Sequence, residues 1–132
     1  MSVSDPIGDF IIQLKNAGAV RKERVLLPYS EFKMAVAQKL KEAGYVLNVE
    51  KKGKKIKKML EIELSYEKEG AHKVRGVKRI SKPGRRVYRR AEDLHPVRFG
   101  YGSLILSTPR GVKTNEEARK EQVGGEVLFE IW

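Results

Sequence analysis

Two stretches near the N-terminus carry apolar residues at helical spacing, so each is expected to form a helix with one buried face. Asp5 and Pro6 favour the start of the first helix, while Ser30 and Gly44 are placed to cap and to end the second. The apolar stripe predicted for the first helix is Ile7, Phe10, Ile11, Leu14 and Ala17. The stripe predicted for the second is Phe32, Ala35, Val36, Leu40 and Ala43.

Extended segments lie between and after these helices. Residues 25–27 read as a short strand that leads into Pro28. Residues 45–50 and 60–66 read as a hairpin around Gly53, because Leu60, Ile62 and Leu64 alternate with polar residues in the second strand. The order helix, strand, helix, strand, strand predicts a compact α+β unit.

The second half of the chain changes to short strands, predicted around residues 74–80, 87–89, 104–107 and 126–132. One brief helix near 115–122 interrupts them, with a capping box from Thr114 and Glu117 at its start and Gly124 placed to stop it. The polar segment 67–70 breaks the pattern. We therefore predict an α+β fold with an N-terminal domain over 1–67 and a mostly β C-terminal domain over 71–132.

Charge narrows the choice of partner. The 132 residues carry a formal net charge of +11, which favours a polyanion: nucleic acid first, an anionic membrane surface second. No apolar run approaches a membrane span, and acidic Asp5 and Asp9 stand where a signal peptide would be basic. These features predict an intracellular protein without a membrane partner.

Signatures of catalysis and of metal binding are lacking in the sequence. It contains no cysteine, and its two histidines, His72 and His95, have no cluster of metal-ligand residues around them. No pair of carboxylates suggests acid–base chemistry. We expect neither an enzyme nor a cofactor.

The segment 73–90 is the strongest candidate for binding. It holds no acidic residue and nine basic ones, namely Lys73, Arg75, Lys78, Arg79, Lys82, Arg85, Arg86, Arg89 and Arg90. Pro83 and Gly84 favour a turn, so two paired strands would present a phosphate-binding face. The alternative is an ordinary solvated face, but such faces usually mix charges of both signs, which favours binding.

A second candidate is the turn formed by residues 107–111. Pro109 and Gly111 favour a tight turn, and Ser107 and Thr108 either read RNA base edges and 2′-hydroxyls or only cap backbone groups. Composition alone leaves both readings open. Tyr88, within the basic segment, either stacks on a base or packs in the core, and core packing is the commoner outcome for a strand tyrosine. The terminal residues Phe129, Ile131 and Trp132 read as core.

Several motifs occur together along the chain. They are Asp5-Pro6-Ile7, Asn16-Ala17, Pro28 with Ser30 and Lys33, Arg79-Ile80-Ser81-Lys82-Pro83-Gly84, Val87-Tyr88, Ser107-Thr108-Pro109-Arg110-Gly111, and Thr114, Ala118 and Arg119 with Gly124-Gly125-Glu126. In this combination the chain resembles the eighth protein of the small ribosomal subunit, in its bacterial form. The likeness covers essentially the whole sequence, and the basic segment and the serine–threonine turn are its most specific parts.

This resemblance implies a structural constituent of the cytoplasmic ribosome, without catalysis or cofactor. It implies primary binding to the central domain of 16S rRNA early in assembly, contact with neighbouring small-subunit proteins and, in some members, repression of their own messenger RNA. Carried over to this chain, Ser107, Thr108, Pro109, Arg110 and Gly111 form the specificity element. Lys82, Arg85, Arg86 and Tyr88 line the adjoining surface.

Overall fold

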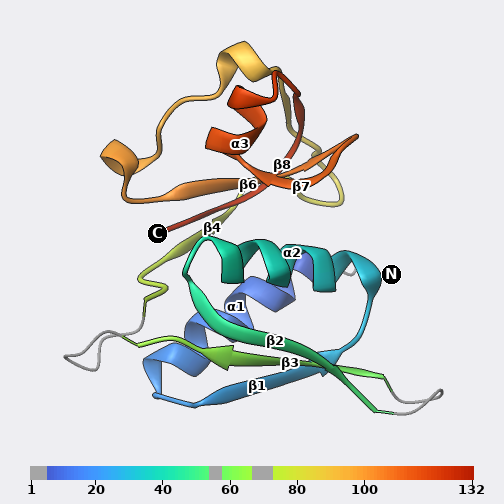
Figure 1. The fold of residues 1–132 in the computed structure, drawn as a ribbon, viewed down its shortest axis with the longest axis vertical. Coiled ribbons are helices and arrows are strands. Elements are labelled where there is room, and N and C mark those ends of the chain that lie inside the picture. The colour runs from blue at the N-terminus through green and yellow to red at the C-terminus, as the bar shows by residue number, and fades with distance from the viewer. Residues whose placement is uncertain (1–5, 54–57, 67–72) are drawn as a thin grey trace. The chain divides into compact units, whose positions relative to one another are not determined.

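A computed structural model describes residues 6–53, 58–66 and 73–132, and these form two compact units (Figure 1). One unit is Phe10–Arg75; the other is Gly76–Trp132 together with the chain up to Asp9. Both units mix helices and strands, which confirms the predicted α+β class. The expected boundary at 67–70 lies outside the described residues, so the division into 1–67 and 71–132 stays a prediction.

The N-terminal unit has the predicted order of helix, strand, helix, strand, strand. Its elements are α1 (Pro6–Ala19, of which the residues from Phe10 belong to this unit), β1 (Arg24–Pro28), α2 (Glu31–Glu42), β2 (Val46–Lys52) and β3 (Met59–Leu64). The strands form an antiparallel sheet in the order β1-β3-β2, and Figure 1 shows both helices on one side of it. The predicted stripe of α1 and the alternating residues Leu60, Ile62 and Leu64 are buried, as expected.

The second helix is capped as predicted but buries a different face. Ser30 Oγ accepts a hydrogen bond from the Lys33 N–H at 3.1 Å, and Gly44 follows the helix with a φ of 88°. The fully buried residues are Val36, Ala37 and Leu40, whereas Phe32, Ala35 and Ala43 of the predicted stripe are exposed. Each residue turns about 100° around a helix, so Ala35 lies far from a face centred between Val36 and Ala37.

The C-terminal unit is built around its last strand. Its elements are β4 (Val77–Arg79), β5 (Tyr88–Arg89), the 3₁₀ turns η1 (Ala91–Asp93) and η2 (Arg98–Gly100), β6 (Ser103–Thr108), β7 (Gly111–Thr114), α3 (Asn115–Lys120) and β8 (Gly125–Ile131). The sheet runs β4-β8-β6-β7, and β5 also pairs with β8. β7 was not predicted, because its four residues include one large apolar side chain, Val112, and show no alternation.

A small core joins α3 to the sheet. Ala118 of α3 is fully buried in a cluster with Leu94, Leu106 and Val127. The predicted capping box is present, with Thr114 and Glu117 each bonding the other's backbone N–H. The predicted stop is wrong: Gln122 rather than Gly124 takes the left-handed conformation after the helix, with a φ of 56°. Among the terminal residues, Phe129 and Ile131 are fully buried, while Trp132 is partly exposed beneath the Arg98 guanidinium.

The basic segment 73–90 contains the predicted turn but not the predicted pair of strands. The backbones of Lys82 and Arg85 exchange two hydrogen bonds of 2.8 and 2.9 Å around Pro83 and Gly84. However, β4 and β5 both pair with β8, one after the other along its length. The seven residues of β8 are long enough to hold both short strands, and local composition does not reveal which strand is the partner.

Candidate nucleic-acid interface

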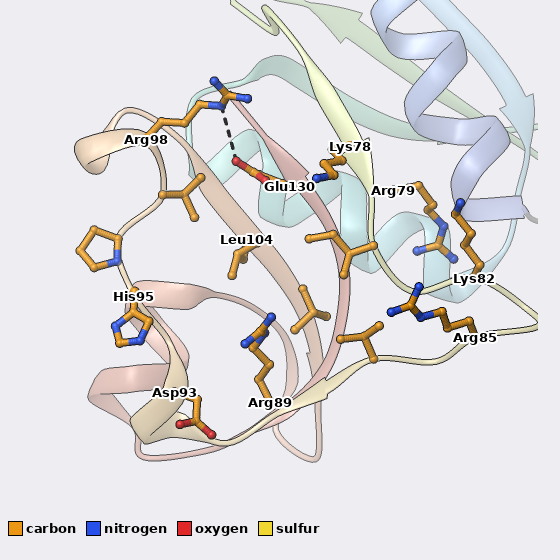
Figure 2. Close-up of a pocket in the computed structure, with 15 residues that line it drawn as sticks. Lys78, Arg79, Lys82, Arg85, Arg89, Asp93, His95, Arg98, Leu104 and Glu130 are labelled. Carbon is orange, nitrogen blue, oxygen red and sulfur yellow. Dashed lines mark ion pairs between the residues drawn. The ribbon is translucent and has the colours of Figure 1, made fainter.

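Strand β5 separates two grooves of the C-terminal unit. The first, here called the Tyr88 groove, has a volume of about 770 Å³ and is lined by Tyr88, Arg89, Arg90, Ala91, Glu92, Asp93, Ser107, Thr108, Pro109, Gln122, Gly124, Gly125 and Glu126. The second, the Lys78 groove, has a volume of about 760 Å³ and is lined by Lys78, Arg79, Ile80, Lys82, Arg85, Val87, Arg89, Asp93, His95, Pro96, Val97, Arg98, Leu104, Val127 and Glu130 (Figure 2). Alternation along β5 accounts for this arrangement, since successive side chains point to opposite faces.

Two adjacent glycines allow the walls of the Tyr88 groove to come together. A β-carbon on Gly124 would lie 2.5 Å from the Arg89 carbonyl oxygen, and one on Gly125 would lie 2.1 Å from the Ser107 carbonyl oxygen. Real β-carbons do not approach carbonyl oxygens this closely, so neither position accepts a side chain without movement of the backbone. The Gly124–Gly125 pair therefore places Tyr88 and the 107–111 turn on the same groove.

The 107–111 turn is a two-residue hairpin loop between β6 and β7. Thr108 pairs with Gly111, whose φ is 103°, and Pro109 and Arg110 form the tip. The Thr108 hydroxyl donates to the Gly111 carbonyl at 2.7 Å and accepts from the Arg110 N–H at 3.1 Å. Thr108 thus caps backbone groups, which is one of the two readings that the sequence left open.

Ser107 differs from its neighbour in the turn. Its side chain is partly exposed on the Tyr88 groove, and within the part of the chain that the structure describes its hydroxyl has no hydrogen-bond partner. A serine hydroxyl both donates and accepts, so it can bond either kind of group on a ligand. Of the two hydroxyls, Ser107 carries the one available for an external contact.

Tyr88 is not a core residue, so of the two alternatives that the sequence left open the structure excludes core packing. Its exposed fraction is 69%, although it belongs to a strand paired with the sheet. The reason is that β5 has only two residues at the edge of β8, and the side chain at position 88 points away from the core cluster. An exposed tyrosine ring on a groove offers a flat apolar surface with a polar tip.

A carboxylate beside the Tyr88 groove organises the basic turn. Glu126 Oε2 accepts from the Ser81 hydroxyl at 2.6 Å and from Arg86 Nη1 at 3.0 Å. The Ser81 hydroxyl in turn accepts from the Val87 N–H at 2.9 Å, and Ser81 is fully buried. Sequence reasoning missed the roles of Ser81 and Glu126, whose only signal was their place in the shared motifs. The Arg86 guanidinium is therefore partly neutralised by Glu126.

The remaining predicted residues lie elsewhere on the unit. Lys82 and Arg85 line the Lys78 groove, so the structure does not bring them onto the same groove as Tyr88. Arg110 projects from the turn, where its side chain is 63% exposed and lies 3.9 Å from Glu121. The predicted site is thus divided: Tyr88, Ser107, Thr108 and Pro109 share one groove, and two predicted phosphate ligands share the other.

The described residues contain no group of three or more His, Cys, Asp or Glu side chains that could hold a metal ion. His72 lies outside the described part of the chain. No helix among those described is long and apolar enough to span a membrane.

Comparison with known proteins supports the resemblance inferred from the motifs. The model of the family described as "Ribosomal protein S8" matches residues 5–132. Among curated proteins, the small ribosomal subunit protein uS8 of Rubrobacter xylanophilus is 44% identical over 132 residues, covering 100% of both chains. Proteins of the same name from Mycoplasmopsis agalactiae and Mycoplasma mobile are 46% identical over 132 residues and 44% identical over 130 residues. The match to the Mycoplasmopsis agalactiae protein covers 100% of both chains. The match to the Mycoplasma mobile protein covers 98% of this chain and 97% of the relative. That family is a structural component of the ribosome, which confirms the prediction of a non-enzymatic protein.

Proposed function

Because the chain belongs to the ribosomal protein S8 family, we propose that it binds the central domain of the small-subunit rRNA through the Tyr88 groove and the 107–111 turn. The observation that carries this proposal is the placement of an exposed tyrosine ring, 69% accessible, on the same groove as the unpartnered Ser107 hydroxyl. Aromatic faces stack on unpaired bases, and hydroxyls bond base edges and 2′-hydroxyl groups. The groove offers both.

The charged residues around this groove supply affinity rather than selectivity. Arg86 and Arg110 have exposed side chains beside it, and Lys82 and Arg85 lie on the neighbouring groove. Guanidinium and ammonium groups hold phosphates of any RNA, and these contacts fix position without reading sequence. Selectivity for the cognate RNA then depends on Tyr88 and on Ser107, held in place by the Thr108 cap and Gly111.

The test is binding to an RNA fragment from the central domain, measured against a generic RNA duplex of equal length. Replacing Tyr88 by alanine should weaken cognate binding by about fivefold or more, since stacking on an aromatic ring contributes about 1–3 kcal/mol per base. Binding to the duplex should change little. The matched control is Tyr101→Ala, which removes a tyrosine that is 85% exposed and lines neither groove. Equal losses for both variants would refute the assignment.

The same RNA-binding surface would serve in assembly of the small subunit and in regulation of the chain's own messenger RNA. We propose that the bound chain helps to order the central domain for neighbouring small-subunit proteins, and that it represses its own messenger RNA when that RNA presents a similar fold. Ring and hydroxyl contacts depend on RNA shape and not on its origin, which supports a shared surface. Co-sedimentation with small subunits at moderate salt tests the ribosomal role, and a reporter fused to the chain's own leader sequence tests repression.

A further inference from the structure

The Lys78 groove combines a basic rim with an apolar floor. Figure 2 shows Leu104 near its middle, with Lys78, Arg79, Lys82 and Arg85 on one side and Arg89 and His95 on the other. Partly buried Ile80 and Val87 extend the floor, and fully buried Val127 lies beneath it. We propose that this groove is a second RNA site, separate from the Tyr88 groove, that takes an unpaired RNA strand.

Four of the cations on the rim have no acidic partner among the residues that the structure describes. In the described chain, Lys78, Lys82, Arg85 and Arg89 have no ion pair with a carboxylate. The two acidic residues that line the groove already have partners: Glu130 lies 3.5 Å from Arg98, and Asp93 lies 3.4 Å from Arg90. Four uncompensated cations around one hollow repel one another, and a polyanion relieves that repulsion.

The floor distinguishes a single strand from a duplex. Sites for single-stranded nucleic acid join a basic groove, which follows the backbone, to surfaces that receive unstacked bases. Here the apolar floor and the exposed His95 ring supply such surfaces. A duplex hides its base faces in the stack, so it can reach the rim but cannot use the floor. An acidic peptide would satisfy the charges as well, but it would leave the imidazole without a stacking partner.

The position of Arg89 connects and separates the two sites. Its carbonyl lies against Gly124 in the Tyr88 groove, whereas its side chain enters the Lys78 groove (Figure 2). The adjacent Tyr88 points to the other groove. Two RNA segments, one in each groove, would therefore contact opposite faces of the same β-strand, β5. The proposal rests on the proposed function only in taking RNA as the ligand.

The experiment uses the full chain and a short oligouridylate, with binding followed by fluorescence anisotropy at several salt concentrations. The double variant Lys78→Gln/Arg89→Gln should lose about tenfold or more in affinity, and the salt dependence should fall by about 0.7 for each cation removed. His95→Ala should lose several-fold without any change in salt dependence. The matched control Arg119→Gln/Lys120→Gln removes two exposed cations that line neither groove and should bind like the wild type.

Because the Tyr88 ring can also stack on an unpaired base, the double variant is measured in a Tyr88→Ala background as well, where Lys78→Gln/Arg89→Gln should lose the same factor in oligouridylate affinity as in the wild type. The proposal is overturned if the double variant binds like its control, or if Tyr88→Ala abolishes oligouridylate binding. It is also overturned if a blunt RNA duplex binds the Lys78 groove as tightly as the oligomer. Displacement of the oligomer by an equal or lower concentration of oligoglutamate would assign the groove to an acidic protein segment instead.

Discussion

At the scale of single residues, the Tyr88 groove depends on the absence of a β-carbon at Gly124 and at Gly125. Both positions lie where a neighbouring backbone occupies the space of a side chain, and the groove closes around them. In the sequence, Gly124 was interpreted as a helix stop, and the pair was recognised only as part of a shared motif. Local pattern could not identify the close contact, because the strands that approach these glycines come from residues 89 and 107, distant along the chain.

Replacing Gly125 by alanine should lower the free energy of unfolding by about 2–3 kcal/mol, since a β-carbon 2.1 Å from the Ser107 carbonyl oxygen forces the strands apart. Chemical denaturation followed by circular dichroism measures this. The control is Gly84→Ala in the basic turn, where an added β-carbon meets nothing within 4 Å and φ is not positive. That variant should change stability by less than about 0.5 kcal/mol. Matching midpoints for the two variants would show that the strands adjust freely.

At the scale of elements, helix starts were easier to predict than helix ends or strand partners. Ser30 and Thr114 cap their helices as the sequence indicates, because a cap requires only a hydroxyl and an N–H three residues away. The pairing of β4 and β5 with β8 was not predicted, because it depends on residues about forty to fifty positions away. β7 was missed for a different reason: its partner β6 is adjacent in the chain, but its four residues show no alternation of apolar and polar side chains.

The end of α3 gives a second test of stability. Gln122 adopts a φ of 56°, a conformation in which a β-carbon is strained and glycine is not. Gln122→Gly should therefore raise the free energy of unfolding by up to about 1 kcal/mol, measured by thermal or urea denaturation. Gln122→Ala is the control: it keeps the β-carbon and should give no gain. A glycine variant less stable than the alanine variant would contradict this account of the helix end.

At the scale of the whole molecule, the excess of positive charge identified the class of partner but not its place. The net charge of +11 favoured nucleic acid, and the family match agrees with a ribosomal protein. Composition could not show that the residues of the basic segment 73–90 are divided between two grooves. Tyr88 and Ser107 share one groove, while Lys82 and Arg85, which precede β5 in the chain, line the other.

This division of labour predicts that selectivity and salt dependence can be changed separately in binding to a central-domain rRNA fragment. Ser107→Ala should weaken cognate binding by about threefold to tenfold, since a hydrogen bond contributes about 0.5–1.5 kcal/mol, and should leave the slope of affinity against salt unchanged. Lys82→Gln/Arg85→Gln should reduce that slope by about 0.7–0.9 per cation and weaken cognate and generic RNA alike.

Titrations at four or more salt concentrations, with both RNAs and both variants, separate the two effects. Ser107 is the better residue for the hydroxyl test, because an alanine at Thr108 would also remove the two hydrogen bonds that hold the turn. Two results would contradict this account: a changed salt slope for Ser107→Ala, or a loss of cognate binding alone for the double variant. Either would show that selectivity does not belong to the Tyr88 groove and phosphate binding to the Lys78 groove. If both results agree with expectation, the 107–111 turn recognises the cognate RNA, and the surrounding cations contribute affinity for any RNA without selectivity.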